Sequence, residues 1–597
     1  MDNMNQEAGN QERQTFRKSL QLPVVSAVLL WLSQPPLSLW LLASVSLIPL
    51  LMLVERPRPV RKSEWVALWI GGTFFWLASL EGLRHAHPLM FLGWFALSGY
   101  LAVYWLLFVY SARWIHQQRG LPLFLAVAIA WIGQEYLRNH LLTGISACML
   151  GHTMADVPVA MQIANWFGSY GVSLFVVAVN VVCYRSLPYL LIASRLRILK
   201  GCCSHLEKGK PLSRNATGLD SIAAVSWITV VLVIGMIKLE SAPTNKERSL
   251  GRYLLIQRSE PVEYVQSTSR SFEIYQAYAR QTLDALTQCD AAVDAVIWPE
   301  SMYSAGNPWM EIPSFSNRLE TDSQNPLAAS AAAAGVTPLD LRRAVEESQS
   351  YFESRSADLY AAAKNISSSG RPMDFLVGCG VLRYSDQPEI YCGLVQFADQ
   401  GKVKQWYGKN HLVMFGEYIP IVSSVPLLKR LLPPGMGLDR GSAPEPMKVG
   451  DASLLPNICI ETAVEHVTVN HLRGLHQKGL TADAVVTVTN DGWFSQSSIL
   501  EHHLRCAQFV AVGIGRPILS SANNGPTAWI DHHGRVQDRL KFGSHGHLIA
   551  EPTRREDVTL YTRIGDWPAL FLGLATVLPL LRLRKRRETS TGNESKL

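Results

Sequence analysis

The stretch LMFLGWFALSGYLAVYWLLFVYS, residues 89–111, contains no charged side chain. A run of about 20 apolar residues is what an α-helix needs to cross the hydrocarbon core of a bilayer. The same pattern predicts seven further spans, at residues 20–33, 36–54, 65–83, 121–137, 168–193, 221–239 and 567–582. Pro35 and Pro36 separate the first two of these spans, as in a helical hairpin. The sequence therefore predicts a polytopic membrane protein with eight helical spans.

Lysine and arginine are distributed unevenly between the segments that join these spans. Basic residues mark cytoplasmic loops, and they gather at residues 13–18, 56–62, 113–119, 195–214 and 582–587. The alternate loops contain little beyond Arg84 and Arg138. We therefore expect both termini in the cytoplasm and residues 240–566 outside it. The net charge of +7 then reflects membrane topology and gives no reason to expect nucleic acid binding.

The segment outside the membrane alternates short β runs with helical patterns. RYLLIQ (252–257), DAVIWPE (294–300) and DAVVTVTND (483–491) are typical of buried strands, and DFLVGCGVL (374–382) and IYCGLVQFA (390–398) of hairpin partners. Helical spacing follows at residues 271–286 and 498–513. This alternation favours an α/β domain. We expect a membrane domain at 1–245, an α/β domain at 246–563 with a patternless surface insertion at 306–350, and a last span with a basic tail at 564–597.

Three reactive side chains lie where β runs end. Glu300 follows AVIWP, Lys409 follows KVKQWYG, and Cys459 lies within LPNICIETAVEHV, residues 455–467. Taken alone, each has a simpler interpretation as a turn residue, a surface charge or a packed core thiol. Catalytic groups are common at strand ends because a rigid scaffold holds them in a crevice there. We therefore take the three together as a candidate site.

Several motifs occur in an order that resembles one family. They are VIWPES (296–301), GKNHLVMFGEYIP (408–420), ICIE (458–461), TNDGWF (489–494) and SSANNGPTAWIDHHGRV (520–536). Together with EYLRNHLLTGISACMLGHT (135–153), FGSYGVSLFVV (167–177) and YTRIGDWPALFLGL (561–574), they resemble the apolipoprotein N-acyltransferases, which are membrane-embedded members of the nitrilase superfamily. The chain departs from that pattern at Ile460, where an aromatic residue is usual, and at Met414, where proline is usual.

The resemblance implies an αββα sandwich with a Glu–Lys–Cys triad. By motif, the triad falls on Glu300, Lys409 and Cys459, and two supporting acids fall on Glu417 and Glu461. Four further residues are expected to shape the pocket: Asn490, Trp493, Asn523 and Asn524.

The residue types suit nucleophilic catalysis. A thiol must become a thiolate to attack, and we expect both a helix N-terminus and Lys409 to favour the anion at Cys459. Glu300 is expected to take the thiol proton and later that of an incoming amine. No metal or cofactor is predicted. Cys379 and Cys392 lie in adjacent predicted strands, and either a disulfide or two buried thiols fits their positions.

The resemblance implies acyl transfer from a phospholipid, through a thioester on Cys459, to the α-amino group of a diacylglyceryl-modified N-terminal cysteine of an apolipoprotein. The expected location is the bacterial inner membrane, with the α/β domain on the periplasmic side. A membrane-tethered amidase of the nitrilase type is the alternative, in which water resolves the acyl-enzyme. A catalytically silent lipid- or lipoprotein-binding protein is a third class, which would require the triad to be lost.

Overall fold

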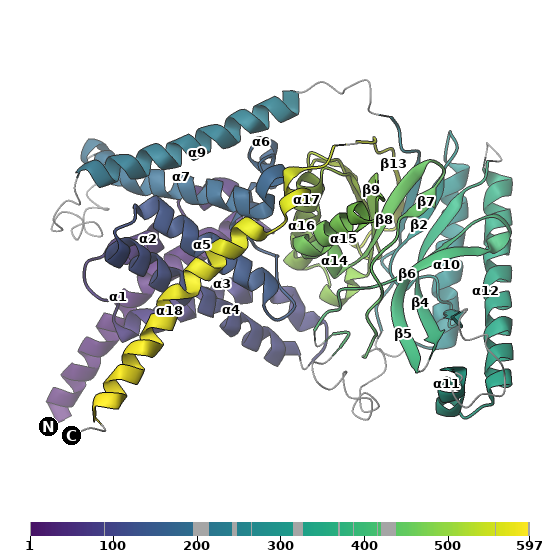
Figure 1. The fold of residues 1–597 in the computed structure, drawn as a ribbon, viewed down its shortest axis with the longest axis horizontal. Helices are drawn as coiled ribbons and strands as arrows, with labels where there is room; N and C mark the ends of the chain where they lie inside the picture. The colour runs from purple at the N-terminus through teal and green to yellow at the C-terminus, as the bar shows by residue number, and fades with distance from the viewer. Residues whose placement is uncertain are drawn as a thin grey trace. The chain divides into compact units, whose positions relative to one another are not determined.

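The computed structural model (Figure 1) divides into two compact units. The helical unit comprises Met1–Ala242, Ser497–Arg505 and Ile564–Leu597, and the sheet unit comprises Pro243–Gln496 and Cys506–Arg563. The structure describes residues 2–88, 90–194, 214–240, 248–263, 266–313, 326–367, 371–385, 387–414, 416–418, 437–555 and 557–594.

The helical unit is built mainly from apolar helices. Its α-helices are α1 (Asp2–Ser33), α2 (Ile48–Glu55), α3 (Lys62–Ser79), α4 (Met90–Arg113), α5 (Leu123–His140), α6 (Pro158–Met161), α7 (Ala164–Ser194), α9 (Arg214–Glu240) and α18 (Trp567–Glu594). Large apolar side chains such as Phe74, Leu92 and Phe571 are exposed on it. An apolar exterior of this kind suits contact with lipid.

Three helices in the described residues are long and apolar enough to cross a membrane. They are Met90–Gln118, Ala164–Leu187 and Gly218–Glu240, and they correspond to the predicted spans 89–111, 168–193 and 221–239. The prediction of one helix at 36–54 was wrong, because the chain forms the 3-10 helix η1 (Trp40–Ser44) and then begins α2 at Ile48. Pro49 lies in the first turn of α2, where its missing N–H is tolerated. The total of eight spans stays a prediction.

The C-terminal helix packs against the N-terminal helices within the helical unit. The Thr576 hydroxyl on α18 donates to the carbonyl of Ile129 on α5 at 2.9 Å. A Cβ at Gly133 on α5 would lie 2.5 Å from the carbonyl oxygen of Leu572, so only glycine allows this approach. The first and last parts of the chain therefore form one bundle.

The sheet unit contains two β-sheets. In the described residues, the first has the strand order β13-β1-β2-β4-β5-β6, with β3 beside β4, and the second has the order β12-β11-β10-β9-β8-β7. The strands of the first sheet are β1 (Tyr253–Gln257), β2 (Ala295–Trp298), β3 (Trp309–Glu311), β4 (Asp374–Tyr384), β5 (Pro388–Phe397), β6 (Val403–Gly408) and β13 (Gly546–Ala550). Those of the second are β7 (Met447–Val449), β8 (Ala452–Ile458), β9 (Ala484–Thr489), β10 (Ile518–Ala522), β11 (Ala528–Ile530) and β12 (Val536–Arg539). The predicted hairpin is confirmed, because β4 and β5 pair antiparallel.

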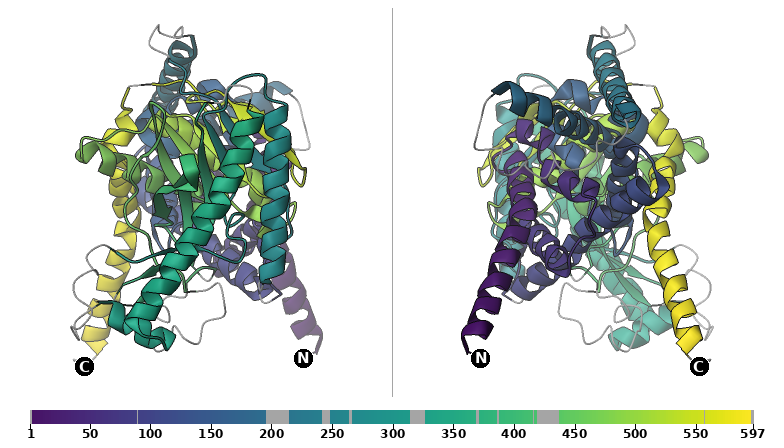
Figure 2. Two further views of the ribbon diagram at one scale, coloured as in Figure 1. Left: turned by 90° about the vertical axis from the view of Figure 1, so that its right-hand side faces the viewer. Right: turned by 90° about the vertical axis from the view of Figure 1, so that its left-hand side faces the viewer.

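The two sheets form the middle of a four-layer sandwich, as predicted. Alternate side chains of one strand point to opposite faces, so Tyr253 and Leu255 of β1 enter the core between the sheets. Leu254 and Ile256 face the helices α10 (Thr268–Thr287) and α12 (Pro338–Ile366). These two helices lie side by side on the first sheet (Figure 2). The helix α15 (Glu465–Gln477) and the C-terminal half of α16 (Ser498–Ile514) lie beyond the second sheet (Figure 1).

The expectation of a patternless stretch at 306–350 was wrong for its described part. Residues 309–311 form β3, and the alanine-rich segment forms α11 (Pro326–Ala334), as its high helix propensity favours. Thr337 caps α12 and Pro338 opens it. Leu341 and Val345 are buried against β3 and β4 side chains. Residues 314–325 lie outside the described part, and an insertion relative to the family stays a prediction.

Candidate active site

Cys459 lies at a sharp turn from β8 into α14 (Ile460–Ala463). Its φ is +50°, a value that residues other than glycine rarely adopt. Its N–H donates to the carbonyl of Val488 on β9 at 2.9 Å, which fixes the turn to the sheet. Strained turns of this kind hold nucleophiles at the edge of a sheet. The helix that Cys459 opens is only one turn long, so the dipole contribution expected from the sequence is small.

Glu300 follows β2 and is almost completely buried, at 8% exposure. It lies over β4, where a Cβ at Gly378 would come within 2.4 Å of its Cα. Oε2 accepts the backbone N–H of Asn490 at 3.0 Å, and Oε1 accepts the thiol of Cys392 at 3.1 Å. Lys409 Nζ is 3.8 Å from the same Oε1. Glu300 is therefore held by one contact on each carboxylate oxygen and faces a cation.

Lys409 directly follows β6 and is 1% exposed. Its backbone N–H donates to the carbonyl of Cys392 at 2.8 Å, and its own carbonyl accepts the N–H of Gly441 at 2.9 Å. Its ammonium is 2.5 Å from Oε1 of Glu417. Burial alone would lower the pKa of Lys409, but the charges of Glu417 and Glu300 outweigh it and raise the pKa well above its ordinary value. Lys409 is therefore a fixed cation.

Glu461 connects the segments that carry Lys409 and Cys459. Oε2 accepts the N–H of Ile458, the residue before Cys459, at 2.7 Å. Oε1 accepts the N–H groups of Asn410 and His411, just after Lys409, at 2.6 and 3.0 Å, and the Tyr407 hydroxyl at 2.7 Å. Burial raises the pKa of Glu461 to about 7, and these four donors oppose the shift. Glu461 therefore supports two of the three candidate residues by holding the backbone just after Lys409 and just before Cys459.

The electrostatics of the site favour a protonated thiol at rest. Burial raises the pKa of Cys459 well above its ordinary value, the charge of Lys409 lowers it, and the charges of Glu300 and Asp491 raise it further. Burial also raises the pKa of Glu300, against the lowering by Lys409. Lys409 favours the anion at Cys459, as expected, but burial and the two carboxylates outweigh its effect. A base must take the thiol proton during attack, and Glu300 is the carboxylate that the site offers.

One of the four predicted pocket residues, Asn490, contacts Glu300 directly. Asn490 does so through its backbone N–H, and its side-chain oxygen accepts the Asn523 amide at 3.0 Å. The Asn523 amide also donates to Asn524 Oδ1 at 2.9 Å, so these three residues brace one another. Trp493 is half-buried in the 3-10 helix η7 (Asp491–Phe494). Contact of Trp493 or Asn524 with substrate stays a prediction.

Cys379 and Cys392 do not form the disulfide that the sequence left open. Cys379 pairs with Gly393 across the hairpin, and Cys392 pairs with Gly380. An offset of one residue places the two thiols on opposite faces of the sheet, with Cys379 toward α12 and Cys392 in the core between the sheets. Both are free. The contact of Cys392 with Glu300 was not predicted, because it depends on the register of the hairpin, which the sequence does not fix.

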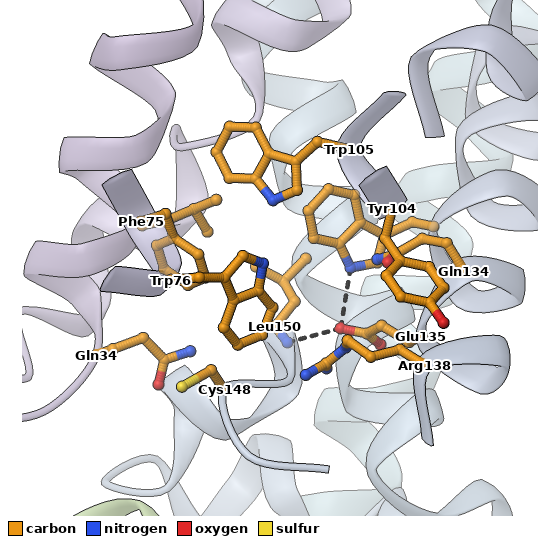
Figure 3. A pocket seen from close by; sticks show the side chains of 12 residues that line it. Gln34, Phe75, Trp76, Tyr104, Trp105, Gln134, Glu135, Arg138, Cys148 and Leu150 are labelled. Carbon is orange, nitrogen blue, oxygen red and sulfur yellow. Dashed lines mark hydrogen bonds between the residues drawn. The ribbon is translucent and has the colours of Figure 1, made fainter. Parts of the chain in front are cut away.

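A small cavity lies inside the helical unit (Figure 3). Glu135 on its wall accepts the Trp131 indole N–H at 3.1 Å and the Leu150 backbone N–H at 2.8 Å. The Arg138 guanidinium lies 5.0 Å from the centre of the Trp76 ring. The cavity offers about 20 Å³, which is room for roughly one water molecule. It is therefore too small for a lipid, and the buried Glu300–Lys409 pair beside Cys459 is the stronger candidate for chemistry.

A buried carboxylate, a fixed ammonium and a thiol at a strained turn can form and resolve an acyl-enzyme. The sandwich and this arrangement define a protein of the carbon-nitrogen hydrolase class, and residues 264–559 match that family. Residues 26–182 match the apolipoprotein N-acyltransferase N-terminal domain.

Relatives along the whole chain are more specific. An apolipoprotein N-acyltransferase from Rhodopirellula baltica is 40% identical over 94% of this chain and 97% of its own length. The chain belongs to the apolipoprotein N-acyltransferase family. A relative of the same name from Vibrio vulnificus is 25% identical over 96% of this chain and 99% of its own. A solved structure of a nitrilase-superfamily amidase from Nesterenkonia is 14% identical. The match covers 51% of this chain and 90% of that chain, with a TM-score of 0.30.

Proposed function

We propose that this protein transfers a fatty acyl chain from a phospholipid to the α-amino group of the N-terminal diacylglyceryl-cysteine of an apolipoprotein. The observation that carries the proposal is the buried Glu300 and Lys409, 3.8 Å apart at the ends of two strands, whose charges both act on the thiol of Cys459. Membership of the apolipoprotein N-acyltransferase family gives this triad its substrates.

In the first half-reaction, Glu300 takes the Cys459 proton while sulfur attacks the ester carbonyl of the phospholipid. The negative charge that develops on the carbonyl oxygen is stabilised by the Lys409 ammonium, which is buried and already in place. The tetrahedral intermediate breaks the ester bond, and the leaving lysophospholipid oxygen receives the proton from Glu300. The product is a thioester on Cys459.

In the second half-reaction, the α-amino group of the acceptor attacks the thioester and gives its proton to Glu300. A second tetrahedral intermediate forms beside Lys409 and collapses by breaking the carbon–sulfur bond. The sulfur leaves and is reprotonated by Glu300, so that an amide is formed and the enzyme returns to its starting state. Every proton moves through one carboxylate, and the chemistry requires neither a metal nor a cofactor.

The helical unit provides a reason for transfer at a membrane. Both substrates carry acyl chains that leave a bilayer only at a large free-energy cost. We place the protein in the bacterial inner membrane with eight spans, both termini in the cytoplasm and the α/β domain, residues 246–563, on the periplasmic side. The membrane parts are residues 1–245 and 564–597. The asymmetry of basic loops supports this orientation, and three long apolar helices support the spans.

The experiment that tests the function uses the purified full-length protein in phospholipid vesicles with a labelled acyl chain. The acceptor is a synthetic peptide that begins with diacylglyceryl-cysteine, and the control acceptor is the same peptide with an acetylated amino group. With the free-amine peptide we expect labelled N-acyl peptide and an equal amount of lysophospholipid. With the acetylated peptide we expect no N-acyl peptide. Label released as free fatty acid with both acceptors, and no N-acyl peptide, would contradict transfer and favour the hydrolase alternative.

The orientation has its own test. Reporter fusions placed after residue 270 and at the C-terminus should give opposite results, periplasmic for the first and cytoplasmic for the second. Identical results for the two fusions would contradict the last span, and a cytoplasmic result after residue 270 would contradict the odd number of membrane crossings before the catalytic domain.

A further inference from the structure

Cys392 contacts two of the three triad residues, although it has no place in the proposed chemistry. Its thiol donates to Oε1 of Glu300 at 3.1 Å, and its carbonyl accepts the backbone N–H of Lys409 at 2.8 Å. It lies in the middle of β5, is 8% exposed, and belongs to the core between the sheets. A thiol is a weak donor and is more often packed against apolar neighbours, so its contact with a buried carboxylate is specific.

The surroundings of Glu300 show what this thiol adds. Oε2 is held by the N–H of Asn490, and the only other group near Oε1 among the described hydrogen bonds and ion pairs is the Lys409 ammonium, at 3.8 Å. Lys409 is closer to Glu417, at 2.5 Å. The charged and titratable groups that act on Glu300 and Cys459 are therefore Lys409, Glu417, Cys392 and Asp491. Cys392 is the side-chain donor at hydrogen-bond distance from the base.

We propose that Cys392 is a positioning residue of the acyl transfer, whose S–H fixes the rotamer of Glu300 and stabilises its ionised form. The inference rests on the proposed function, because it assumes that Glu300 is the base. Two donors, the Asn490 N–H and the Cys392 thiol, then orient the Glu300 carboxylate. The Lys409 ammonium stays available to the developing oxyanion. The backbone contact from Cys392 to Lys409 ties the base and the cation to the same residue of β5.

The Cys392 thiol should affect the pH dependence of acylation. A donor to a carboxylate favours the charged form, and the Cys392 thiol lowers the pKa of Glu300 in this way while burial raises it. Removal of the thiol should therefore raise the pKa of Glu300 further. The acid limb of the rate profile should move to higher pH by about one unit, as expected for the loss of one hydrogen bond to a charged group.

The test measures single-turnover acylation of Cys459 by intact-protein mass spectrometry, from about pH 5 to 9, with phospholipid vesicles as donor. Cys392→Ala should shift the acid limb upward, and Cys392→Ser, whose hydroxyl is also a donor, should restore it. Cys379→Ala is the matched control, because that buried thiol lies on the opposite face of the same hairpin and contacts Ser304 instead. It should leave the pH profile unchanged even if it lowers the melting temperature.

The outcomes separate this inference from the proposed function. An unchanged acid limb in Cys392→Ala, or the same shift in Cys392→Ser, would overturn the positioning role while acylation of Cys459 stands. An acyl group mapped to Cys392 would overturn it as well, because the thiol would then be a nucleophile. No adduct on the parent chain would overturn the proposed function itself, and the inference with it. If Cys392→Ala does not fold, Cys392→Val, which also lacks a donor, replaces it with the same expected shift.

Discussion

The ammonium of Lys409 is paired with Glu417 rather than with Glu300: Nζ is 2.5 Å from Oε1 of Glu417 and 3.8 Å from Oε1 of Glu300. The other oxygen of Glu417 accepts the N–H of Val413 at 2.8 Å, which fixes the carboxylate in the loop after Lys409. Glu417 therefore balances most of the buried cation's charge, and Glu300 faces the same cation from a longer distance. This division of roles lets one carboxylate neutralise and the other act as a base.

Glu417→Gln should lower the rate of acylation and move its acid limb to lower pH. Without the charge of Glu417, Lys409 has only Glu300 to pair with, and an ion pair makes that carboxylate a weaker base. The charge of Glu417 also raises the pKa of Glu300, so its removal lowers that pKa. Single-turnover acylation across pH measures both effects. Glu445→Gln, at an exposed position, is the control, and a shift to higher pH in Glu417→Gln would contradict the division of roles.

Glu300→Gln and Lys409→Met should differ in their response to pH. In the parent protein the base must be ionised, and burial raises the pKa of Glu300 above its ordinary 4.5, so acylation is lost as pH falls through that raised value. Glu300→Gln should be slower by about 10² to 10⁴-fold, with a rate that rises with pH because hydroxide can replace the base. Lys409→Met should be slower by about 10² to 10³-fold, with less recovery, because no solvent species replaces a fixed cation.

Melting temperatures measured beside these rates give the control for folding. Lys402→Met removes an exposed lysine just before β6, the strand that Lys409 follows. It should change neither the acylation rate nor the melting temperature. If Glu300→Gln and Lys409→Met both lose activity equally at every pH, in proportion to a lower melting temperature, the two residues only hold the structure together. The assigned roles would then be wrong.

Glu461→Gln should lower both stability and the acylation rate without moving the pH profile. An amide offers one acceptor oxygen, so it cannot satisfy donors from Ile458 on one side and from Asn410 and Tyr407 on the other. A buried N–H left without a partner costs about 1–3 kcal/mol. The profile should keep its shape because Glu461 does not contact Glu300 in the described residues. A changed acid limb at unchanged melting temperature would show instead that Glu461 takes part in proton transfer.

Strand ends were the part of the site that sequence patterns could locate. Pro299 stops β2, a glycine ends β6 and the turn after β8 begins at Cys459, so each reactive residue lies where a strand ends. The layers of the sandwich came from the resemblance to a family. A supporting role for Glu417 was expected from its motif, but its direct contact with Lys409 depends on the course of the loop between them, where Glu417 also accepts the Val413 N–H.

Other parts needed the register or the course of the backbone. Whether Cys379 and Cys392 face each other depends on a one-residue offset in the hairpin, which spacing along the chain does not fix. The break within 36–54 depends on where one helix ends and the next begins, and apolar composition does not report it. For α12 the signal was present, because Leu341, Val345, Phe352 and Leu359 follow helical spacing, but the alanine run before them obscured it.

The central claim is that Cys459 carries the acyl group. Its most direct test is mass spectrometry of the purified protein after incubation with phospholipid vesicles, with the modified residue mapped by proteolysis under conditions that preserve thioesters. The account predicts one acyl chain on Cys459 that is released by the acceptor amine or by hydroxylamine. It predicts no adduct in Cys459→Ala. In Cys459→Ser it allows only a stable ester that forms much more slowly. An adduct that persists in Cys459→Ala, or that maps to Cys506, Cys379 or Cys392, would contradict it.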